Sequence, residues 1–136
     1  MKNKRIFVLG VASVLFVLVA GTVLADEYVI DTHTYTRADG VIRRDGVYSG
    51  AGSSRNEASA VDRVNEGPIP HGIYTLRNVG TTNLGPVTIE CVPSPNNVMY
   101  GRRGFYIHGG TRSEGCIIIN DPEFRRSLDG HRLTVR

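Results

Sequence analysis

The most informative segment of the sequence is Phe105-Tyr106-Ile107-His108-Gly109-Gly110-Thr111-Arg112-Ser113-Glu114-Gly115-Cys116-Ile117-Ile118-Ile119. Its two ends are rich in β-branched and aromatic residues, which favour strands. The polar middle contains three glycines, so the backbone can turn tightly between the strands. The sequence therefore predicts two strands, with His108 at the end of the first and Cys116 at the start of the second.

The flanking sequence also favours strands. Asp-Gly pairs at 39–40 and 45–46 close hairpins, so we predict an antiparallel meander of strands at 28–35, 41–43 and 47–49. A rigid turn at 67–72 leads into a strand at 73–76, and further strands follow at 87–92 and 133–135. An N-cap, a proline and an early acid predict a short helix from about residue 122 to 128. The expected fold is mainly β, a β-sandwich or β-barrel with one short helix.

The first 25 residues have the order of a secretory signal. A basic start, Met1-Lys2-Asn3-Lys4-Arg5, precedes an apolar run, and small residues at Val23 and Ala25 predict cleavage after Ala25. The alternative is an uncleaved anchor, because the run is long enough to cross a bilayer. Either way we expect residues 26–136 to form one domain that is periplasmic or secreted.

The net charge of +3 comes entirely from Lys2, Lys4 and Arg5. The acids and bases of residues 26–136 cancel, so the basic pI gives no reason to expect a nucleic-acid partner. The segment after Ala25 has no lysine, which excludes a Ser–Lys hydrolase mechanism. No His, Cys or acid spacing is typical of a metal site, and we expect neither a metal nor a cofactor.

His108 and Cys116 have the residue types of a nucleophilic dyad. A thiolate is the nucleophile, and a nearby histidine lowers its pKa or takes its proton. Gly115 has no side chain, so its N–H and that of Cys116 could face a developing oxyanion. The alternative is structural: in an oxidising compartment, Cys116 could form a disulfide with Cys91.

The pattern His108-Gly109 followed by Ser113-Glu114-Gly115-Cys116 resembles the signature of the L,D-transpeptidase catalytic domain, which acts on peptidoglycan stem peptides through a cysteine. The turn at 67–74 is similar to the Pro-x-Gly-x-Tyr turn of that family. Tyr48-Ser49-Gly50 with Arg55-Asn56, and residues 101–109, resemble more narrowly the compact branch that includes interbacterial toxins acting in the periplasm. The resemblance spans about residues 28 to 119.

The resemblance implies roles for eight residues. Cys116 would be the nucleophile and His108 the base, with Ser113 orienting the dyad and Gly115 opening the oxyanion pocket. The family's usual arginine two residues after the cysteine is replaced here by Ile118. We therefore expect Arg102 or Arg112 to bind a substrate carboxylate, and we place Gly109 and His71 with the substrate-binding residues.

The function implied is a peptidoglycan-modifying cysteine acyltransferase that acts on tetrapeptide stems, by L,D-transpeptidation, D-amino acid exchange or L,D-carboxypeptidase cleavage. The alternative is a non-catalytic peptidoglycan-binding module stabilised by a Cys91–Cys116 disulfide. Stem peptides are the expected partners, with an immunity protein as a further one. Toxins of the compact branch generally lack a signal peptide, so the sequence leaves open whether the target is a rival's wall or the cell's own.

Overall fold

A computed structural model describes residues 25–136. The predicted export segment, residues 1–25, lies outside the described residues except for Ala25, which begins the first strand. Within the described part of the chain, no helix has the length and apolar character needed to cross a membrane.

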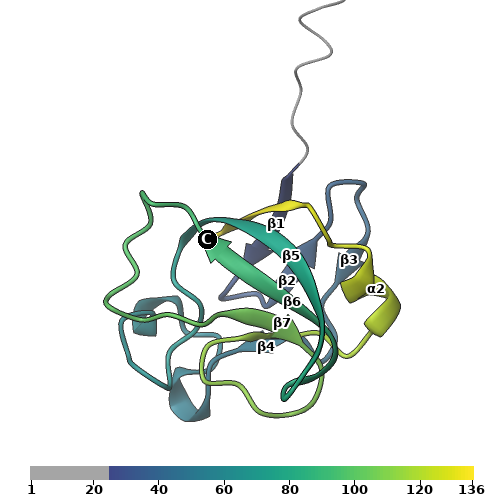
Figure 1. Ribbon diagram of the computed structural model, residues 1–136. Helices are drawn as coiled ribbons and strands as arrows, with labels where there is room; N and C mark the ends of the chain where they lie inside the picture. The colour runs from purple at the N-terminus through teal and green to yellow at the C-terminus, as the bar shows by residue number, and fades with distance from the viewer. Residues whose placement is uncertain (1–24) are drawn as a thin grey trace, which may run out of the picture.

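The described residues form one nine-stranded sheet in the order β3-β2-β1-β9-β5-β6-β7-β8-β4 (Figure 1). Most neighbours are antiparallel, but β1 pairs with β9 and β7 with β8 in parallel. The strands are β1 Ala25–Val29, β2 Thr34–Thr36, β3 Ile42–Arg43, β4 Tyr48–Ser49, β5 Gly72–Thr82, β6 Gly85–Pro93, β7 Tyr106–His108, β8 Ile117–Ile118 and β9 Arg132–Val135. The expected mainly β fold with one short helix is confirmed.

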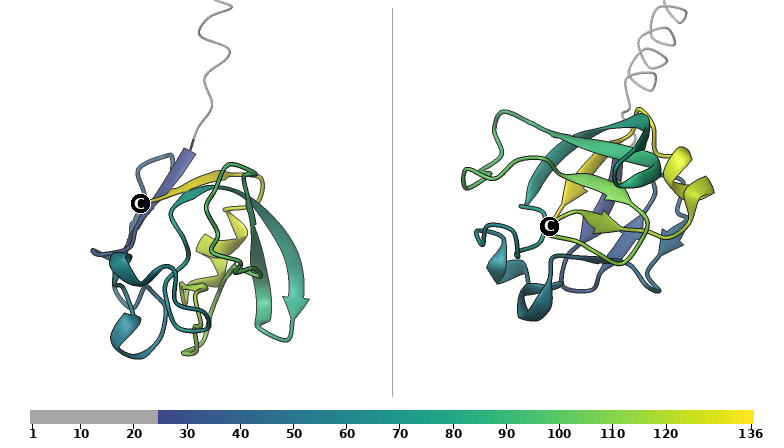
Figure 2. Two further views of the ribbon diagram at one scale, coloured as in Figure 1. Left: turned by 90° about the vertical axis from the view of Figure 1, so that its left-hand side faces the viewer. Right: turned by 60° about the horizontal axis from the view of Figure 1, so that its bottom comes forward.

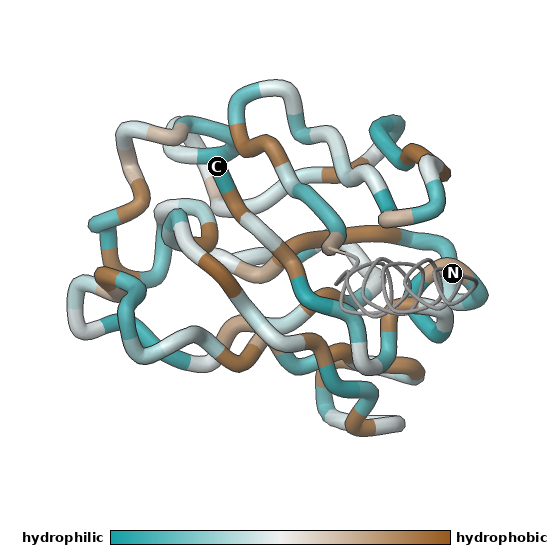
Figure 3. The backbone as a smooth tube through the Cα atoms, turned by 90° about the horizontal axis from the view of Figure 1, so that it is seen from above, coloured by the Kyte–Doolittle hydropathy of each residue, from teal (hydrophilic) through white to brown (hydrophobic). Residues whose placement is uncertain are grey.

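The sheet curls around a single core (Figure 2). Hydrophobic and polar residues alternate along the tube in Figure 3, as expected where one face of a strand is buried. The large buried side chains come from both halves of the sheet, and they include Tyr28, Tyr35, Tyr74, Ile107 and Leu133. The short strands of the site are thereby attached to the same core as the long β5–β6 hairpin.

Two predictions about strands were wrong. Residues 28–35 form two antiparallel strands, β1 and β2, with Tyr28 opposite Tyr35. The turn between them contains His33 at a φ of 42°. The second error concerns β4, which leaves the predicted meander and pairs with β8, with Ser49 opposite Ile117. This pairing joins residues far apart in the chain, so local turn signals could not reveal it.

The single α-helix of the described chain, α2, spans Pro122–Arg126 and begins as predicted. Asp121 is the N-cap, and its carboxylate accepts the Phe124 N–H at 3.0 Å. Phe124 packs edge-on against Tyr35, with ring centroids 5.5 Å apart. Because α2 follows β8 directly, this packing anchors the end of the segment that carries the candidate nucleophile.

The strands β7 and β8 sort their side chains onto two faces. In their parallel register, Ile107 lies opposite Ile117, and both face the core. Side chains alternate along a strand, so His108 and Cys116 point to the opposite face. The sheet thus places the candidate base, at the end of β7, and the candidate nucleophile, directly before β8, on one surface.

Candidate active site

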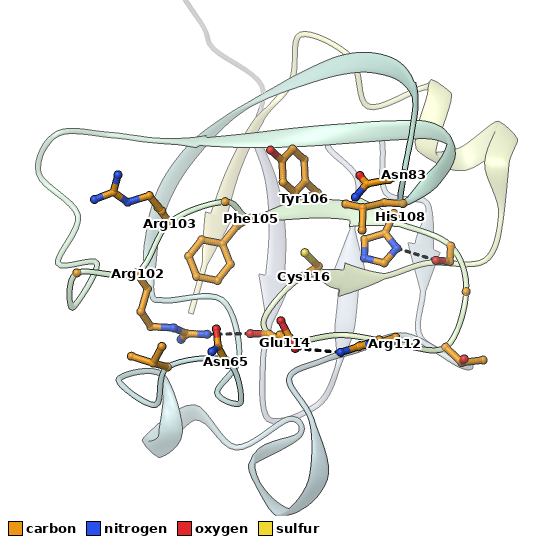
Figure 4. A pocket seen from close by; sticks show the side chains of 17 residues that line it. Asn65, Asn83, Arg102, Arg103, Phe105, Tyr106, His108, Arg112, Glu114 and Cys116 are labelled. Carbon is orange, nitrogen blue, oxygen red and sulfur yellow. Dashed lines mark hydrogen bonds and ion pairs between the residues drawn. The ribbon is translucent and has the colours of Figure 1, made fainter.

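Cys116 and His108 line the same cleft, which has a volume of about 790 Å³. Figure 4 shows the thiol and the imidazole facing this hollow, with Phe105 and Tyr106 beside the thiol. Arg112 and Glu114 lie at one edge, and Asn83, from the tip of the β5–β6 hairpin, lies next to His108. The cleft is thus lined by two segments of the sequence motif and closed on one side by a hairpin far from it in sequence.

The backbone fixes the orientation of the His108 ring. Nδ1 lies 2.7 Å from the carbonyl oxygen of Gly109. A carbonyl oxygen can only accept, so Nδ1 carries the hydrogen and Nε2 is left with the basic lone pair. Figure 4 shows Nδ1 pointing toward that carbonyl and the other nitrogen on the side of Cys116. Burial lowers the pKa of His108, although the Gly109 hydrogen bond partly opposes this.

The two cysteines occupy different environments. Both thiols are free, so the disulfide required by the binding-module alternative is absent. Cys91 is buried in the core on β6, and burial raises its pKa well above that of an ordinary thiol. Cys116 is partly exposed in the cleft. Burial raises its pKa too, but a backbone hydrogen bond from Tyr106 lowers it in part. Only Cys116 is accessible to a substrate.

Ser113 organises the loop in front of Cys116, the candidate nucleophile. Its hydroxyl donates to the carbonyl of Cys116 at 2.6 Å and accepts from the N–H groups of Gly50 at 3.0 Å and Gly115 at 3.1 Å. The side chain is buried. Ser113 therefore fixes the backbone of Cys116, whereas we expected its hydroxyl to orient the dyad.

Gly115 is needed for reasons of space and backbone conformation. Its φ is +139°, and a Cβ there would lie 2.6 Å from Phe105 and 2.7 Å from Arg102. Its N–H is bonded to Ser113, so it does not serve the oxyanion pocket that we expected it to form with Cys116. The Cys116 N–H remains as the candidate donor.

Arg102 links several backbone segments around the site. Its buried guanidinium donates to the carbonyls of Pro68 at 2.8 Å, Gly67 at 2.8 Å and Glu114 at 3.1 Å, and also to that of Val61. These bonds connect the proline turn to the loop before Cys116. Because its donors are committed to the backbone, the geometry argues against the expected carboxylate contact at Arg102.

Arg112 is exposed at the edge of the cleft, as a ligand for a substrate carboxylate would be. It pairs with Glu114 at 3.4 Å, and its side chain is 88% exposed. Such a pair contributes little to stability, so a substrate anion can replace Glu114 as its partner. Arg103 also lines the cleft, but its side chain points away from Cys116 in Figure 4.

The other two residues expected to bind substrate, Gly109 and His71, do not lie in the same place. Gly109 lines the cleft next to His108. His71 is exposed on the turn before β5 and is not part of the cleft lining. The turn instead contributes through its backbone, since the Ile69 N–H donates to the Ser49 hydroxyl at 2.9 Å and that hydroxyl donates to the Gly115 carbonyl at 2.8 Å. This chain of bonds is what the Tyr48-Ser49-Gly50 motif supplies.

Two residues beside the site, Asn120 and Arg125, were not predicted from the sequence. Asn120 bonds both backbone groups of Gly110, and the buried Arg125 donates to three backbone carbonyls behind His108. Nothing in the sequence distinguishes Arg125 from its exposed neighbour Arg126. The one local signal for Asn120 is its position directly after the Ile-rich strand, where an amide side chain is also typical of the start of a helix.

No metal-binding arrangement is present within residues 25–136, because no three His, Cys, Asp or Glu side chains are grouped closely enough.

Residues 43–134 match the model of a family described as the Tlde1 domain. The match begins after β1 and β2, includes every motif quoted above and continues through α2 into β9, so it includes the whole of the site. No curated protein and no solved structure matches the chain.

Proposed function

The chain belongs to the Tlde1 domain family, and from that premise we propose that it is a peptidoglycan-modifying cysteine acyltransferase. The family points to an enzymatic effector that targets peptidoglycan. The observation that carries the proposal is the shared cleft of Cys116 and His108, in which a carbonyl fixes the tautomer of the base.

The first step is acylation of Cys116 by a tetrapeptide stem. The thiol proton passes to Nε2 of His108 as the sulfur attacks the carbonyl carbon between the third residue and the terminal D-alanine. The tetrahedral intermediate then collapses, the C–N bond breaks, and His108 returns the proton to the departing amine. D-alanine leaves, and a thioester on Cys116 remains.

The pKa shifts favour a neutral resting pair over a preformed thiolate and imidazolium. Burial raises the pKa of Cys116 and lowers that of His108, so both shifts disfavour the charged forms. Proton transfer therefore accompanies substrate attack. The lowered pKa of His108 keeps its neutral, basic form populated to a lower pH than that of an ordinary imidazole.

The oxyanion of the intermediate would accept the Cys116 N–H, because the Gly115 N–H is bonded to Ser113. Recognition would rest on Arg112, whose guanidinium can leave Glu114 for a stem carboxylate. The acceptor then decides the product: a stem amine gives a crosslink, a free D-amino acid gives exchange, and water gives a tripeptide.

The N-terminal sequence supports a proposal for the setting of this activity. Its basic start and apolar run support export, so we propose that the domain acts in the periplasm or outside the cell. Stem peptides would be its substrates. An immunity protein would be its partner if the target is the wall of a rival.

The test is mass spectrometry after incubation with purified tetrapeptide muropeptides. We expect a thioester adduct on the peptide that contains Cys116, together with release of D-alanine. The products separate hydrolysis, exchange and crosslinking. Cys91→Ala is the matched control, since it removes the other thiol and should acylate normally. Normal turnover by Cys116→Ala, or an adduct on Cys91 alone, would refute the proposal.

A further inference from the structure

The turn at Gly109 and Gly110 controls the state of the base. The Gly109 carbonyl is the partner of His108 Nδ1, at 2.7 Å. If this carbonyl rotated away, Nδ1 would lose its acceptor and the hydrogen could move to Nε2, the nitrogen that must take the proton from Cys116. The peptide after His108 therefore needs a fixed orientation.

Asn120 supplies that restraint through both of its polar atoms. Its Oδ1 accepts the Gly110 N–H at 2.6 Å, and its Nδ2 donates to the Gly110 carbonyl at 3.1 Å. The Gly110 N–H belongs to the same peptide unit as the Gly109 carbonyl, so the first bond fixes the direction of that carbonyl. Gly110 has a φ of +99°. Asn120 thus holds the turn at the peptide unit that matters for His108.

The backbone next to Asn120 is itself held in place by hydrogen bonds. Ile119, next to Asn120, donates its N–H to the His108 carbonyl at 3.0 Å. Arg125 is 3% exposed and donates to the Ile119 carbonyl at 2.7 Å and to the Val87 carbonyl at 2.9 Å. A Cβ on Gly109 would lie 3.0 Å from Asn120 Oδ1 and 3.2 Å from Arg125 Nη1. The turn is therefore packed directly onto both side chains.

We propose that Asn120 is a positioning residue of the acyl transfer. By bonding both backbone groups of Gly110, it holds the Gly109 carbonyl against Nδ1 of His108 and keeps Nε2 free to act on Cys116. This role rests on the proposed function, because it concerns the base of that reaction. Arg125 supports it by fixing the strand end from which Asn120 extends.

The chain contains a matched control for the clamp. Asn97 bonds both backbone groups of Ile73 in the same way, with two contacts of 2.9 Å. It is not part of the cleft lining. Asn97→Ala and Asn120→Ala therefore remove the same pair of hydrogen bonds, in one case away from the dyad and in the other beside it.

The experiment compares the two variants by acylation rate, pH profile and melting temperature. We expect Asn120→Ala to slow acylation of Cys116 at neutral pH by on the order of tenfold or more, since small misplacements of a catalytic group are costly. The Gly109 hydrogen bond raises the pKa of His108. Its loss should therefore move the acidic limb of the rate profile to lower pH. Asn97→Ala should change neither the rate nor the limb.

A second readout does not depend on activity. The ¹⁵N chemical shifts of the imidazole report which ring nitrogen carries the hydrogen, and we expect the Nδ1–H form of His108 to predominate in the wild type and in Asn97→Ala. Asn120→Ala should populate the Nε2–H form. Asn120→Asp, which keeps the acceptor for Gly110 N–H, should restore most of the Nδ1–H form.

The outcomes separate this proposal from the proposed function. If the wild type forms no adduct, the proposed function fails, and the ¹⁵N experiment still tests the clamp. If Asn120→Ala matches Asn97→Ala in rate, acidic limb and tautomer, then Asn120 is a structural turn residue only and the proposal is overturned.

Discussion

Replacement of Gly115 by alanine should be among the most damaging single changes in this domain. The new Cβ would lie 2.6 Å from Phe105 Cε1, 2.7 Å from Arg102 Nη2 and 3.2 Å from the Gly67 carbonyl. The side chains of Phe105 and Arg102 cannot move away freely. Phe105 is buried, and Nη2 of Arg102 donates to the backbone carbonyls of Gly67 and Glu114.

The magnitude has two parts. Overpacking of a filled interior costs about 1–3 kcal/mol. A non-glycine residue at a φ of +139° adds strain of about 1–3 kcal/mol. A total near the middle of these ranges, about 4 kcal/mol, would lower the melting temperature by more than about 10 °C. For a domain of this size, that is a large share of the free energy of unfolding.

The assay is equilibrium unfolding in urea, with Gly130→Ala as control. Gly130 has a φ of +82°, but a Cβ there meets nothing within 4 Å, so its cost should be conformational only, about 1–2 kcal/mol. The reasoning fails if Gly115→Ala is no less stable than Gly130→Ala. A loss of acylation with unchanged stability would instead restore the oxyanion role that we first expected for Gly115.

Three further predictions concern charge and burial. Glu114→Gln should move the pH midpoint of Cys116 alkylation downward, because the Glu114 carboxylate raises the pKa of that thiol; Glu123→Gln on α2 should leave the midpoint unchanged. Cys91→Ala should cost about 1–2 kcal/mol in unfolding free energy with little change in acylation rate. The raised pKa of Cys91 means that its protonated form stabilises the fold fully below the pKa of an unfolded thiol, about 8.5, and that this stability is lost as the pH rises further. Unfolding at pH 7 and at pH 9.5 should therefore differ less in Cys91→Ala than in the wild type.

Much of the candidate site could be predicted from sequence because its signals are local. His108 and Cys116 are separated by a short loop with three glycines, so strand periodicity and turn flexibility are enough to bring them together. The N-cap at Asp121 and the proline after it likewise fixed the start of α2, since capping depends on neighbouring residues. The mainly β fold follows from the same kind of local pattern.

The contacts of Arg102, Arg112, Ser113 and Gly115 around the candidate nucleophile could be seen only in the tertiary structure. Sequence treats Arg102 and Arg112 alike, but one is buried among carbonyls from distant segments and the other is exposed at the cleft. Ser113 and Gly115 bond to or pack against residues from other parts of the chain, such as Gly50 and Phe105. These contacts depend on how the curled sheet brings β4 to β8 and the proline turn beneath the loop. A hydrogen-bond partner 34 residues away, as for Arg102 and Pro68, or 63 away, as for Ser113 and Gly50, leaves no periodicity in the sequence, so only the folded chain shows it.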